Sequence, residues 1–245
     1  MVDRPVEGSW GGTPTAADSA RAPASAGEAG AAGRWQVHRL RGTAAALHHR
    51  PWPTPPVPAV WLLDVDRPAL VVGSTQPEPA PRPRGIDVVR RHSGGGAVLV
   101  APGTVLWVDV FVPARDPLWS PDVGRAFGWL GEAWVEALAG TGLVGARIHR
   151  GPLVHTAWSR SVCFAGLGPG EVTVDGRKVV GISQRRRRDG ALFQCAALLA
   201  WDATGTAAAL GLPEAAAAEL AGLAAALPVD PRSLEEAFLR GVART

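Results

Sequence analysis

The sequence predicts an α/β protein of the α+β type, in which a mixed sheet is flanked by helices. Three observations lead to this fold class. Apolar runs of strand length recur between residues 59 and 201, a helical pattern interrupts them at residues 121–139, and alanine-rich helical patterns follow at residues 203–242. Strands with interspersed and trailing helices are typical of such folds. At 245 residues, with 47% hydrophobic and 19% charged side chains, the chain can bury a sizeable core, which excludes a wholly disordered protein.

The first 33 residues differ in composition from the rest of the chain. They are mainly Gly, Ala, Pro, Ser and Thr without periodicity, and we predict a disordered N-terminal tail. Residues 34–245 are expected to form a single domain, without a C-terminal accessory domain. Because no apolar run is long enough to span a membrane and no signal peptide is visible, we expect a cytoplasmic protein that does not act at a membrane.

The folded part begins with short elements separated by prolines. Residues 43–50 predict a short helix that ends at Pro51, and the five prolines of residues 51–58 require an extended connector. Strands are predicted at residues 59–64, 69–73, 86–92 and 104–112. The last of these is apolar on both faces, as expected of a central buried strand.

The later elements have clearer boundaries. Ser120 is placed to cap a helix over residues 121–139, in which one apolar stripe is formed by Val123, Phe127, Leu130, Trp134 and Leu138. Asp175-Gly176 is typical of a two-residue hairpin turn, here between strands at residues 172–174 and 178–182. A further strand is predicted at residues 192–201, and helices at residues 203–210, 214–227 and 233–242.

Lys178 is the only lysine among the 25 lysine and arginine residues of the chain. A coding bias toward arginine explains the loss of ordinary surface lysines, because exposed ion pairs contribute only about 0–1 kcal/mol. A lysine is retained where arginine fails, namely where a compact ammonium donates to one point or exchanges a proton. This isolation favours a functional role for Lys178 over chance survival.

The hairpin predicts the surroundings of this lysine. With the two-residue turn, Glu171 pairs with Val180, and both share one face with Lys178 and Ile182. Glu171 is then diagonal to Lys178 and within its reach. An exposed ion pair is the simpler interpretation, but the apolar neighbours favour a partly buried wall beside a pocket.

A second feature is the segment RRHSGGGAV, residues 90–98, at the end of a predicted strand. Three consecutive glycines need a cause, because each costs about 0.5–1 kcal/mol in ordering entropy relative to alanine. One cause is a tight turn. The other is close approach of backbone N–H groups to an anionic ligand, with Arg90 and Arg91 supplying charge. Strand alternation sends the two arginines to opposite faces, so at most one contacts the ligand directly.

Together these features resemble the lipoate–protein ligase A family, which is related to biotin ligases and octanoyltransferases. The segment RRHSGGGAV precedes a Pro-Gly pair and, further on, GRKVVGISQR, while LVVGSTQ resembles the family's strand ending in Gly-x-x-Gln. The resemblance implies a biotin/lipoate ligase-like catalytic domain whose arginine–glycine loop wraps a lipoyl or octanoyl group. It also implies that Lys178 contacts the reacting carbonyl and phosphate oxygens, a point contact that the broad fork of arginine does not reproduce.

The implied function is attachment of a lipoyl or octanoyl group to a lysine of an acceptor domain through an acyl-adenylate, which requires ATP and Mg²⁺. Lys178 and Cys163 are the implied catalytic residues. The implied substrate-binding residues are Gly73, Arg90, Arg91, Ser93, Gly94, Gly95, Gly96, Ala97, Glu171, Gly181 and Ser183.

Two departures from the ligases leave other mechanisms open. Val100-Ala101 stands where ligases usually carry His-Asp, and Gly170-Glu171 where they usually carry Asn-Asp. Cys163-Phe164 with the downstream Glu171 instead resembles the octanoyltransferases that form a thioester on cysteine, take the acyl group from an acyl carrier protein and need no cofactor. The simpler interpretation of Cys163 is a small buried hydrophobic residue. A further alternative is a non-catalytic relative that binds lipoyl ligands or nucleic acid.

The arginine run, the histidines, the tryptophans and Cys195 carry less specific signals than the motifs above. The arginine run of residues 185–188 is expected to be a solvated loop or a basic rim that steers an acidic acceptor domain, and nucleic acid is a less favoured partner because no aromatic residues interleave the charges. The histidines lack metal-ligand spacing, so no metal site is predicted. The ten tryptophans fall mostly on apolar stripes and are expected to pack the core, with a hydrocarbon tunnel as the alternative place for Trp107 and Trp158. Cys195 is expected to lie in the core.

Overall fold

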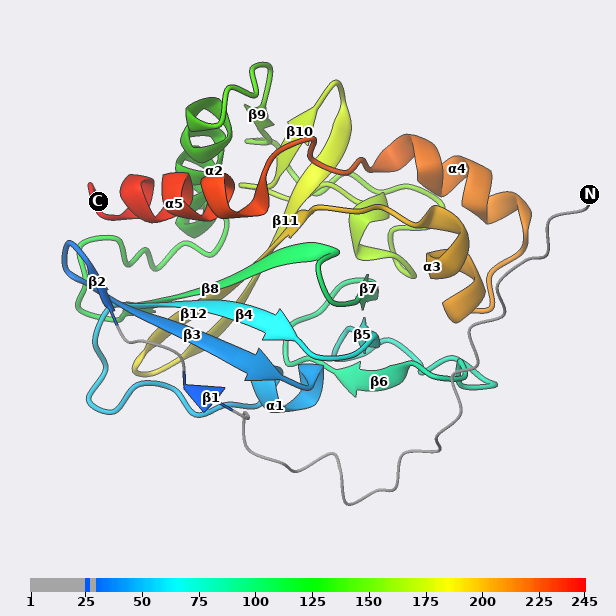
Figure 1. Cartoon of the computed structure of the whole chain (residues 1–245), viewed down its shortest axis with the longest axis horizontal. Helices are drawn as coiled ribbons and strands as arrows, with labels where there is room; N and C mark the ends of the chain where they lie inside the picture. The colour runs from blue at the N-terminus through cyan, green and yellow to red at the C-terminus, as the bar shows by residue number, and fades with distance from the viewer. Residues whose placement is uncertain (1–24, 27–29) are drawn as a thin grey trace, which may run out of the picture.

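The computed structural model describes residues 25–26 and 30–245. Nine of the described strands form one sheet, in the order β1-β3-β4-β8-β12-β11-β10-β9, with β2 paired to β3 (Figure 1). Every neighbouring pair is antiparallel except β3 and β4. A smaller sheet has the order β6-β5-β7. The predicted fold class, a mixed sheet flanked by helices, is confirmed.

The elements have the following bounds. The strands of the large sheet are β1 (Ser25–Ala26), β2 (Gly30–Ala32), β3 (Trp35–Gly42), β4 (Ala59–Val65), β8 (Val105–Pro113), β9 (Arg147–Ile148), β10 (Val172–Val174), β11 (Arg177–Arg187) and β12 (Gly190–Leu198). The smaller sheet has β5 (Ala69–Val72), β6 (Asp87–Arg90) and β7 (Val98–Val100). The helices are α1 (Ala44–His48), α2 (Gly128–Gly140), α3 (Ala203–Ala209), α4 (Ala215–Leu223) and α5 (Pro231–Val242), with short 3₁₀ turns η2 (Arg125–Phe127) and η3 (Cys163–Ala165).

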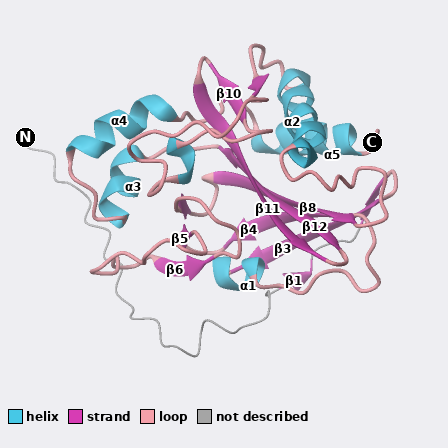
Figure 2. Ribbon diagram, turned by 180° about the vertical axis from the view of Figure 1, so that it is seen from behind, coloured by secondary structure: helices cyan, strands magenta, loops and turns pink. Residues whose placement is uncertain are grey.

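The large sheet separates two apolar cores. On one face, α2 and α5 pack over a cluster that includes Trp134, Phe193 and Phe238. On the other face, α1 and the smaller sheet cover a cluster that includes Trp107 and Phe111. Figure 2 shows the α2–α5 layer and the α1–β5–β6 layer on opposite sides of the sheet. The strands β8 and β12 are buried on both faces of the sheet, which explains why their sequences are apolar without alternation.

The predicted helix at residues 43–50 is confirmed as α1. Its cap is Thr43, whose hydroxyl oxygen accepts a hydrogen bond from the Ala46 amide at 3.2 Å. The helix is short because Pro51 follows closely and cannot continue it.

The helix predicted at residues 121–139 begins later than expected. Ser120 does not cap it, and α2 starts at Gly128 after the turn η2. Asp122 bends the chain instead, because its carboxylate accepts hydrogen bonds from the Gly124 and Arg125 amides. Val123 is 54% exposed and therefore lies outside the apolar stripe, whereas Leu130, Trp134 and Leu138 are buried as predicted.

The hairpin is present, but its register differs from the simple two-residue scheme. Lys178 pairs with Thr173 as expected, and a bulge then places Val172 opposite Val180, so the predicted pairing of Glu171 with Val180 is wrong. Asp175 and Gly176 form the turn at φ of 50° and 75°. The second strand also continues to Arg187, so most of the arginine run lies on β11 and not in a loop.

The C-terminal helices are present with a different boundary for α4. It ends at Leu223, four residues before the predicted end. The chain then pairs with the hairpin, because the Ala225 amide donates to the Lys178 carbonyl and Leu227 donates to Leu198. Tertiary pairing with the sheet thus takes these residues out of the helix.

The N-terminal prediction is mostly outside the described residues. Where the expected tail is described, β1 and β2 pair with β3, so those residues are not irregular. The strand β3 itself was not predicted, although Trp35 and Val37 alternate with polar residues in its first half.

Candidate active site

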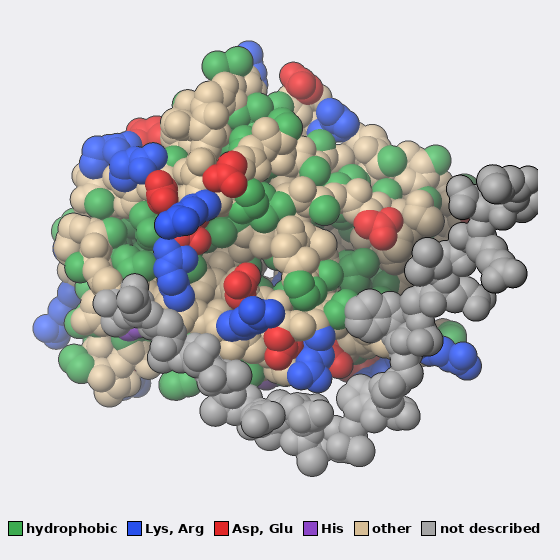
Figure 3. Space-filling view, in the orientation of Figure 1, with side chains coloured by type: hydrophobic (Ala, Val, Ile, Leu, Met, Phe, Trp, Pro, Cys, Tyr) green, Lys and Arg blue, Asp and Glu red, His purple; other side chains and the backbone are tan. Residues whose placement is uncertain are grey.

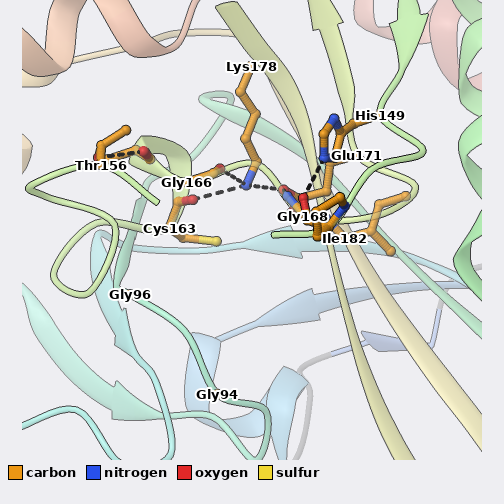
Figure 4. Close-up of polar contacts among 12 residues, drawn as sticks. Gly94, Gly96, His149, Thr156, Cys163, Gly166, Gly168, Glu171, Lys178 and Ile182 are labelled. Carbon is orange, nitrogen blue, oxygen red and sulfur yellow. Dashed lines mark hydrogen bonds and ion pairs between the residues drawn. The ribbon is translucent and has the colours of Figure 1, made fainter. Parts of the chain in front are cut away.

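Lys178 lies at the start of β11 and is 3% exposed. Its Nζ donates to the carbonyl oxygens of Cys163 (3.0 Å) and Gly166 (2.9 Å), and pairs with Oε2 of Glu171 at 2.6 Å (Figure 4). The same nitrogen lies 5.1 Å from the ring centre of Phe164. An ammonium has three N–H donors, so Lys178 is fully hydrogen-bonded in this state.

Glu171 precedes β10 and is 5% exposed. Besides Lys178, its carboxylate accepts the Gly168 amide at 2.6 Å and the Ile182 amide at 3.0 Å. The carboxylate thus connects three backbone segments around the lysine. The predicted proximity of Glu171 and Lys178 holds, even though the bulge changes the strand register.

Cys163 begins the turn η3 and is partly exposed. Its amide donates to the Ala97 carbonyl at 2.9 Å, and the Ala97 amide donates to Ser161 at 2.8 Å. The loop that carries Cys163 is therefore paired with Ala97, directly after the three glycines 94–96, which we call the triglycine segment. Lys178 binds the Cys163 carbonyl from the other side. The triglycine segment and the Lys178 hairpin thus position the cysteine loop together.

The glycines of the triglycine segment have separate structural reasons. A Cβ on Gly96 would lie 2.6 Å from backbone atoms of Val162, and Gly95 has a φ of +93°. A Cβ on Gly73 would lie 1.9 Å from the Gly95 carbonyl oxygen, so these two segments touch through their backbones. Gly94 has nothing within 4 Å of such a Cβ. Close backbone packing and a left-handed turn therefore account for Gly73, Gly95 and Gly96.

The two arginines of this segment have different surroundings. Arg90 is exposed and donates to the carbonyls of Gly73, Ser74 and Gln76, away from the cavities described below. Arg91 is 5% exposed, and one of its terminal nitrogens donates to the carbonyls of Gly94 and Gly96. Its Nε is buried without a hydrogen-bond partner among the described residues. Of the two arginines, only Arg91 lines the cavities described below.

Two adjoining cavities meet at these residues. An apolar slot reaches Val71, Trp107 and Phe164, and a wider polar chamber is lined by the triglycine segment, Glu171 and Lys178. Both cavities are lined by Arg91, Cys163, Ile182 and Ser183. The cysteine therefore lies where an apolar chain and a polar head group would meet.

The remaining predicted site residues lie beside the two cavities or in their walls. Ser93 donates to the Ser183 hydroxyl at 3.1 Å and so joins the triglycine segment to β11. Gly181 lines the slot, where a Cβ would lie 3.3 Å from Cε of Lys178. Trp107 is buried in the core as expected and also lines the slot. Trp158 does not line the slot, because it packs on the α3–α4 side and donates to Glu219.

A buried polar network at the slot was not predicted from the sequence. His48 and Gln194 line the slot, and the Gln194 amide lies 3.1 Å from Nδ1 of His48 and 3.2 Å from Asp109. Asp109 also pairs with Arg50 at 2.6 Å. Burial and the nearby Arg91 and Arg50 hold the pKa of His48 well below its ordinary value, so the ring is neutral. Asp109 and Gln194 are polar residues inside otherwise apolar strands, and this sequence feature could have indicated the network.

Cys195 is buried as predicted and also lies in the wall of the slot. Burial is the main reason that the pKa of its thiol is raised far above the ordinary value. A thiol in this state is not a nucleophile at neutral pH, since the thiolate is the reactive form.

The lining of the chamber suits the phosphates of ATP better than it suits Mg²⁺. Arg91, Arg160 and Lys178 line it and suit phosphate oxygens. Glu171 is the only carboxylate in its lining, and Lys178, Gly168 and Ile182 already occupy that group. No three His, Cys, Asp or Glu side chains come together as a metal site within the described chain. The donor set therefore fits phosphates but does not fit Mg²⁺.

The site thus combines a mixed sheet, an apolar slot, a chamber lined by three cations and a cysteine where the two cavities meet. Residues 43–237 match the family model of the lipoyl protein ligase A/B catalytic domain, and the chain belongs to this family. None of the helices in residues 30–245 is long and apolar enough to cross a membrane.

The chain is also similar to individual proteins. Octanoyltransferase LipM of Clostridioides difficile (strain 630) is 29% identical over 109 residues, which make up 44% of this chain and 39% of that protein. A lipoate–protein ligase A structure bound with ATP has a TM-score of 0.58 at 22% identity, covering 77% of this chain and 72% of that one. The bi-partite lipoate protein ligase of Thermoplasma acidophilum has a TM-score of 0.58 at 21% identity, covering 77% and 71%. At these identities the two structures establish the fold alone.

Proposed function

We propose that this protein transfers an octanoyl or lipoyl group from a thioester donor to a lysine of an acceptor domain, through a thioester on Cys163. One observation carries the proposal: Cys163 lines both the apolar slot and the polar chamber, beside the buried Lys178. The slot suits the hydrocarbon part of the acyl group, and the chamber suits the polar parts of donor and acceptor. The similarity to an octanoyltransferase over 109 residues supports this route.

The transfer consists of two balanced acyl exchanges. The Cys163 thiolate attacks the donor carbonyl, the donor carbon–sulfur bond breaks, and the donor leaves as a thiol after taking a proton. The acceptor lysine amine then attacks the new thioester, an amide forms, and Cys163 is released as a thiolate while the amine loses a proton.

Lys178 has two roles in this scheme. It positions the cysteine loop through the carbonyls of Cys163 and Gly166. To stabilise the developing oxyanion, it must exchange one of these neutral acceptors for the substrate oxygen, because the bond to the charged Glu171 is the stronger one. A point donor on a flexible stem can make that exchange, whereas arginine cannot do so in the same space.

A second candidate is activation of the free acid as an acyl-adenylate. The cationic lining of the chamber by Arg91, Arg160 and Lys178 favours it, because these groups suit the phosphates of ATP. Among the described residues that line the chamber, no carboxylate is free for Mg²⁺, which disfavours this route. We therefore prefer the thioester route, which needs no cofactor. The acceptor lysine is the same in both routes.

The test is mass spectrometry of the intact protein and of a lipoyl acceptor domain. With an octanoyl thioester and no ATP, we expect an octanoyl adduct that peptide mapping places on Cys163, followed by octanoylation of the acceptor. Cys163→Ala should lose both products. Pyrophosphate release from ATP and octanoate without an adduct would establish the adenylate route instead. If neither donor modifies the acceptor, the enzyme proposal is wrong and a ligand-binding relative remains.

A further inference from the structure

The floor of the apolar slot is one row of residues that crosses the large sheet. On this row Gly181 of β11 pairs with Ala196 of β12, and Ala196 pairs with Trp107 of β8. Residues opposite each other on neighbouring antiparallel strands point to the same face, and all three of these residues line the slot. The floor therefore consists of two very small residues followed by a tryptophan.

The row has a reacting end and a far end. A Cβ on Gly181 would lie 3.3 Å from Cε of Lys178 and 3.4 Å from Cζ of Phe164, so Gly181 marks the end beside the proposed site. Trp107 is two strands away, which is about 10 Å at the usual spacing of neighbouring strands. An extended alkyl chain advances about 1.3 Å per carbon–carbon bond, so about eight carbons fill that distance. Leu63 of β4 is the next residue of the row, behind Trp107.

The indole of Trp107 is fixed on two sides. Its Nε1 donates to Oδ1 of Asp109 at 2.8 Å in the protein interior. Its ring packs against His48, with ring centres 4.5 Å apart. A ring that is hydrogen-bonded at its nitrogen and packed against a neighbour cannot turn aside without losing these contacts, and Trp107 therefore forms a firm wall at the far end of the slot.

A buried ion pair holds the group that holds Trp107. Oδ2 of Asp109 pairs with Arg50 at 2.6 Å and accepts the Gln194 amide at 3.2 Å, and the side chains of Arg50 and Asp109 are 6% and 0% exposed. Most ion pairs between described residues instead have an exposed side chain, and on the face in Figure 3 basic and acidic side chains lie next to each other at the surface. Removing two charges from water is costly, so a buried pair needs a compensating role.

We propose that Trp107, positioned by the Arg50–Asp109 pair, is the specificity-determining residue that limits the acyl chain to about eight carbons. This inference rests on the proposed function, which assigns the slot to the acyl chain. The chain lies over Gly181 and Ala196, and its last carbon meets the indole. A longer straight chain has to push Trp107 away from Asp109, which leaves buried polar groups without their hydrogen bond. A shorter chain leaves part of the slot unfilled.

The experiment measures binding of the hexanoyl, octanoyl, decanoyl and dodecanoyl thioesters of N-acetylcysteamine. Calorimetry is done on Cys163→Ala, so that no acyl transfer interferes, and kcat/KM for transfer to a lipoyl acceptor domain is measured on the protein with Cys163. With Trp107 present, octanoyl should bind about tenfold more tightly than hexanoyl, because two more methylenes are buried. Decanoyl should bind about tenfold more weakly than octanoyl, because it overpacks the slot.

Two variants should move the length limit in opposite directions. Trp107→Leu opens the far wall, so decanoyl should bind at least as tightly as octanoyl. Ala196→Val fills the middle of the floor, so octanoyl should lose its advantage over hexanoyl. Trp35→Leu is the matched control, because Trp35 is a fully buried tryptophan in the core on the other face of the sheet, and it should keep the original order of affinities.

The role of the ion pair needs a variant of its own. Arg50→Met/Asp109→Leu removes both charges together, so that neither is left buried alone, and takes away the acceptor of the Trp107 indole. With the ring free to move, the penalty for decanoyl should shrink from about tenfold to less than about threefold. A purely structural pair would change the free energy of unfolding and leave the order of chain lengths as it was.

The outcomes separate this inference from the proposed function. If the variants shift the order of binding but no acceptor is modified, the length limit stands and the proposed function fails. If Trp107→Leu folds and keeps the preference for octanoyl over decanoyl, Trp107 is not the limit. If Trp107→Leu does not fold, Ala196→Val decides, and an unchanged octanoyl preference in that variant overturns the inference. An unchanged decanoyl penalty in Arg50→Met/Asp109→Leu would show that the ion pair does not position Trp107.

Discussion

Lys178 and Glu171 form an ion pair in which Nζ and Oε2 are 2.6 Å apart, and their side chains are 4% and 7% exposed. The three donors of the ammonium meet the carbonyls of Cys163 and Gly166 and this carboxylate. The pair is therefore a closed unit that ties the cysteine loop to the hairpin. Because desolvation of two charges is costly, its geometry and its hydrogen bonds have to offset that cost.

The first prediction concerns this pair. Lys178→Met leaves the Glu171 carboxylate buried without its counter-ion, and we expect a loss of about 3–5 kcal/mol in the free energy of unfolding. The double variant Lys178→Met/Glu171→Gln leaves no buried charge, so it should be more stable than Lys178→Met alone. Urea unfolding of both variants measures the difference. Equal stability of the two would show that the charges are not coupled.

The second prediction separates the two cysteines. Cys195 is buried and burial raises the pKa of its thiol, whereas Cys163 is partly exposed at the cavities. Iodoacetamide at pH 7.5 should therefore alkylate Cys163 in the folded protein and reach Cys195 only in urea. Peptide mass spectrometry reads both sites in one sample. Modification of Cys195 in the native state would contradict the burial described here.

The third prediction compares two neighbouring glycines. A Cβ on Gly96 meets the backbone of Val162 and Cys163 at 2.6–2.8 Å, whereas a Cβ on Gly94 meets nothing within 4 Å. Gly96→Ala should cost about 1–3 kcal/mol in the free energy of unfolding, because the paired backbones must move apart. Gly94→Ala is the matched control and should remain within about 0.5 kcal/mol of wild type. Thermal or urea unfolding tests both, and an unchanged Gly96→Ala would show that the two segments are not closely packed.

The fourth prediction is a loss of stability in mild acid. Burial and the charges of Arg91 and Arg50 lower the pKa of His48 far below 6.5. Above pH 6.5 neither state holds the proton, so stability is complete. Below it the unfolded chain binds a proton that the folded chain does not, and stability falls by about 1.4 kcal/mol per pH unit until the folded-state pKa is reached.

Unfolding in urea between pH 5 and 7.5 measures this slope. His38 and His92 also have lowered pKa values and add to it in the same direction. His48→Gln, which keeps an acceptor for Gln194, isolates the contribution of His48 and should give a shallower slope. An unchanged slope in His48→Gln would mean that His48 titrates normally.

Local rules predicted much of the candidate site. A two-residue turn at Asp175 fixed the pairing of Thr173 with Lys178, and the isolated lysine indicated a functional position before any contact was known. The alternation along β6 predicted that Arg90 and Arg91 face opposite sides, which they do. Which of the two turns inward depends on how the smaller sheet packs, and this was not contained in the segment itself.

Errors had two sources, a local turn at Asp122 and contacts between distant segments. Asp122 bends the chain through its own hydrogen bonds, so α2 starts at Gly128 and not after Ser120. The run of arginines at residues 185–188 was predicted to lie in a solvated loop because it is a string of charges. Pairing with β12 instead makes residues 185–187 the end of the interior strand β11. The network of His48, Gln194 and Asp109 joins three elements that are far apart in sequence, so no spacing rule could find it.

The sequence by itself determined the fold class, the hairpin turn and the glycine-rich contact segment, because each depends on short-range periodicity or on backbone angles that few residues adopt. The tertiary structure decided which groups share a cavity. The packing of η3 against the triglycine segment brings Cys163 to the junction of slot and chamber, and the folded hairpin, with its bulge beside Thr173, holds Glu171 against both Lys178 and the Ile182 amide. These contacts are fixed by burial and close packing between distant segments, which a linear pattern does not record.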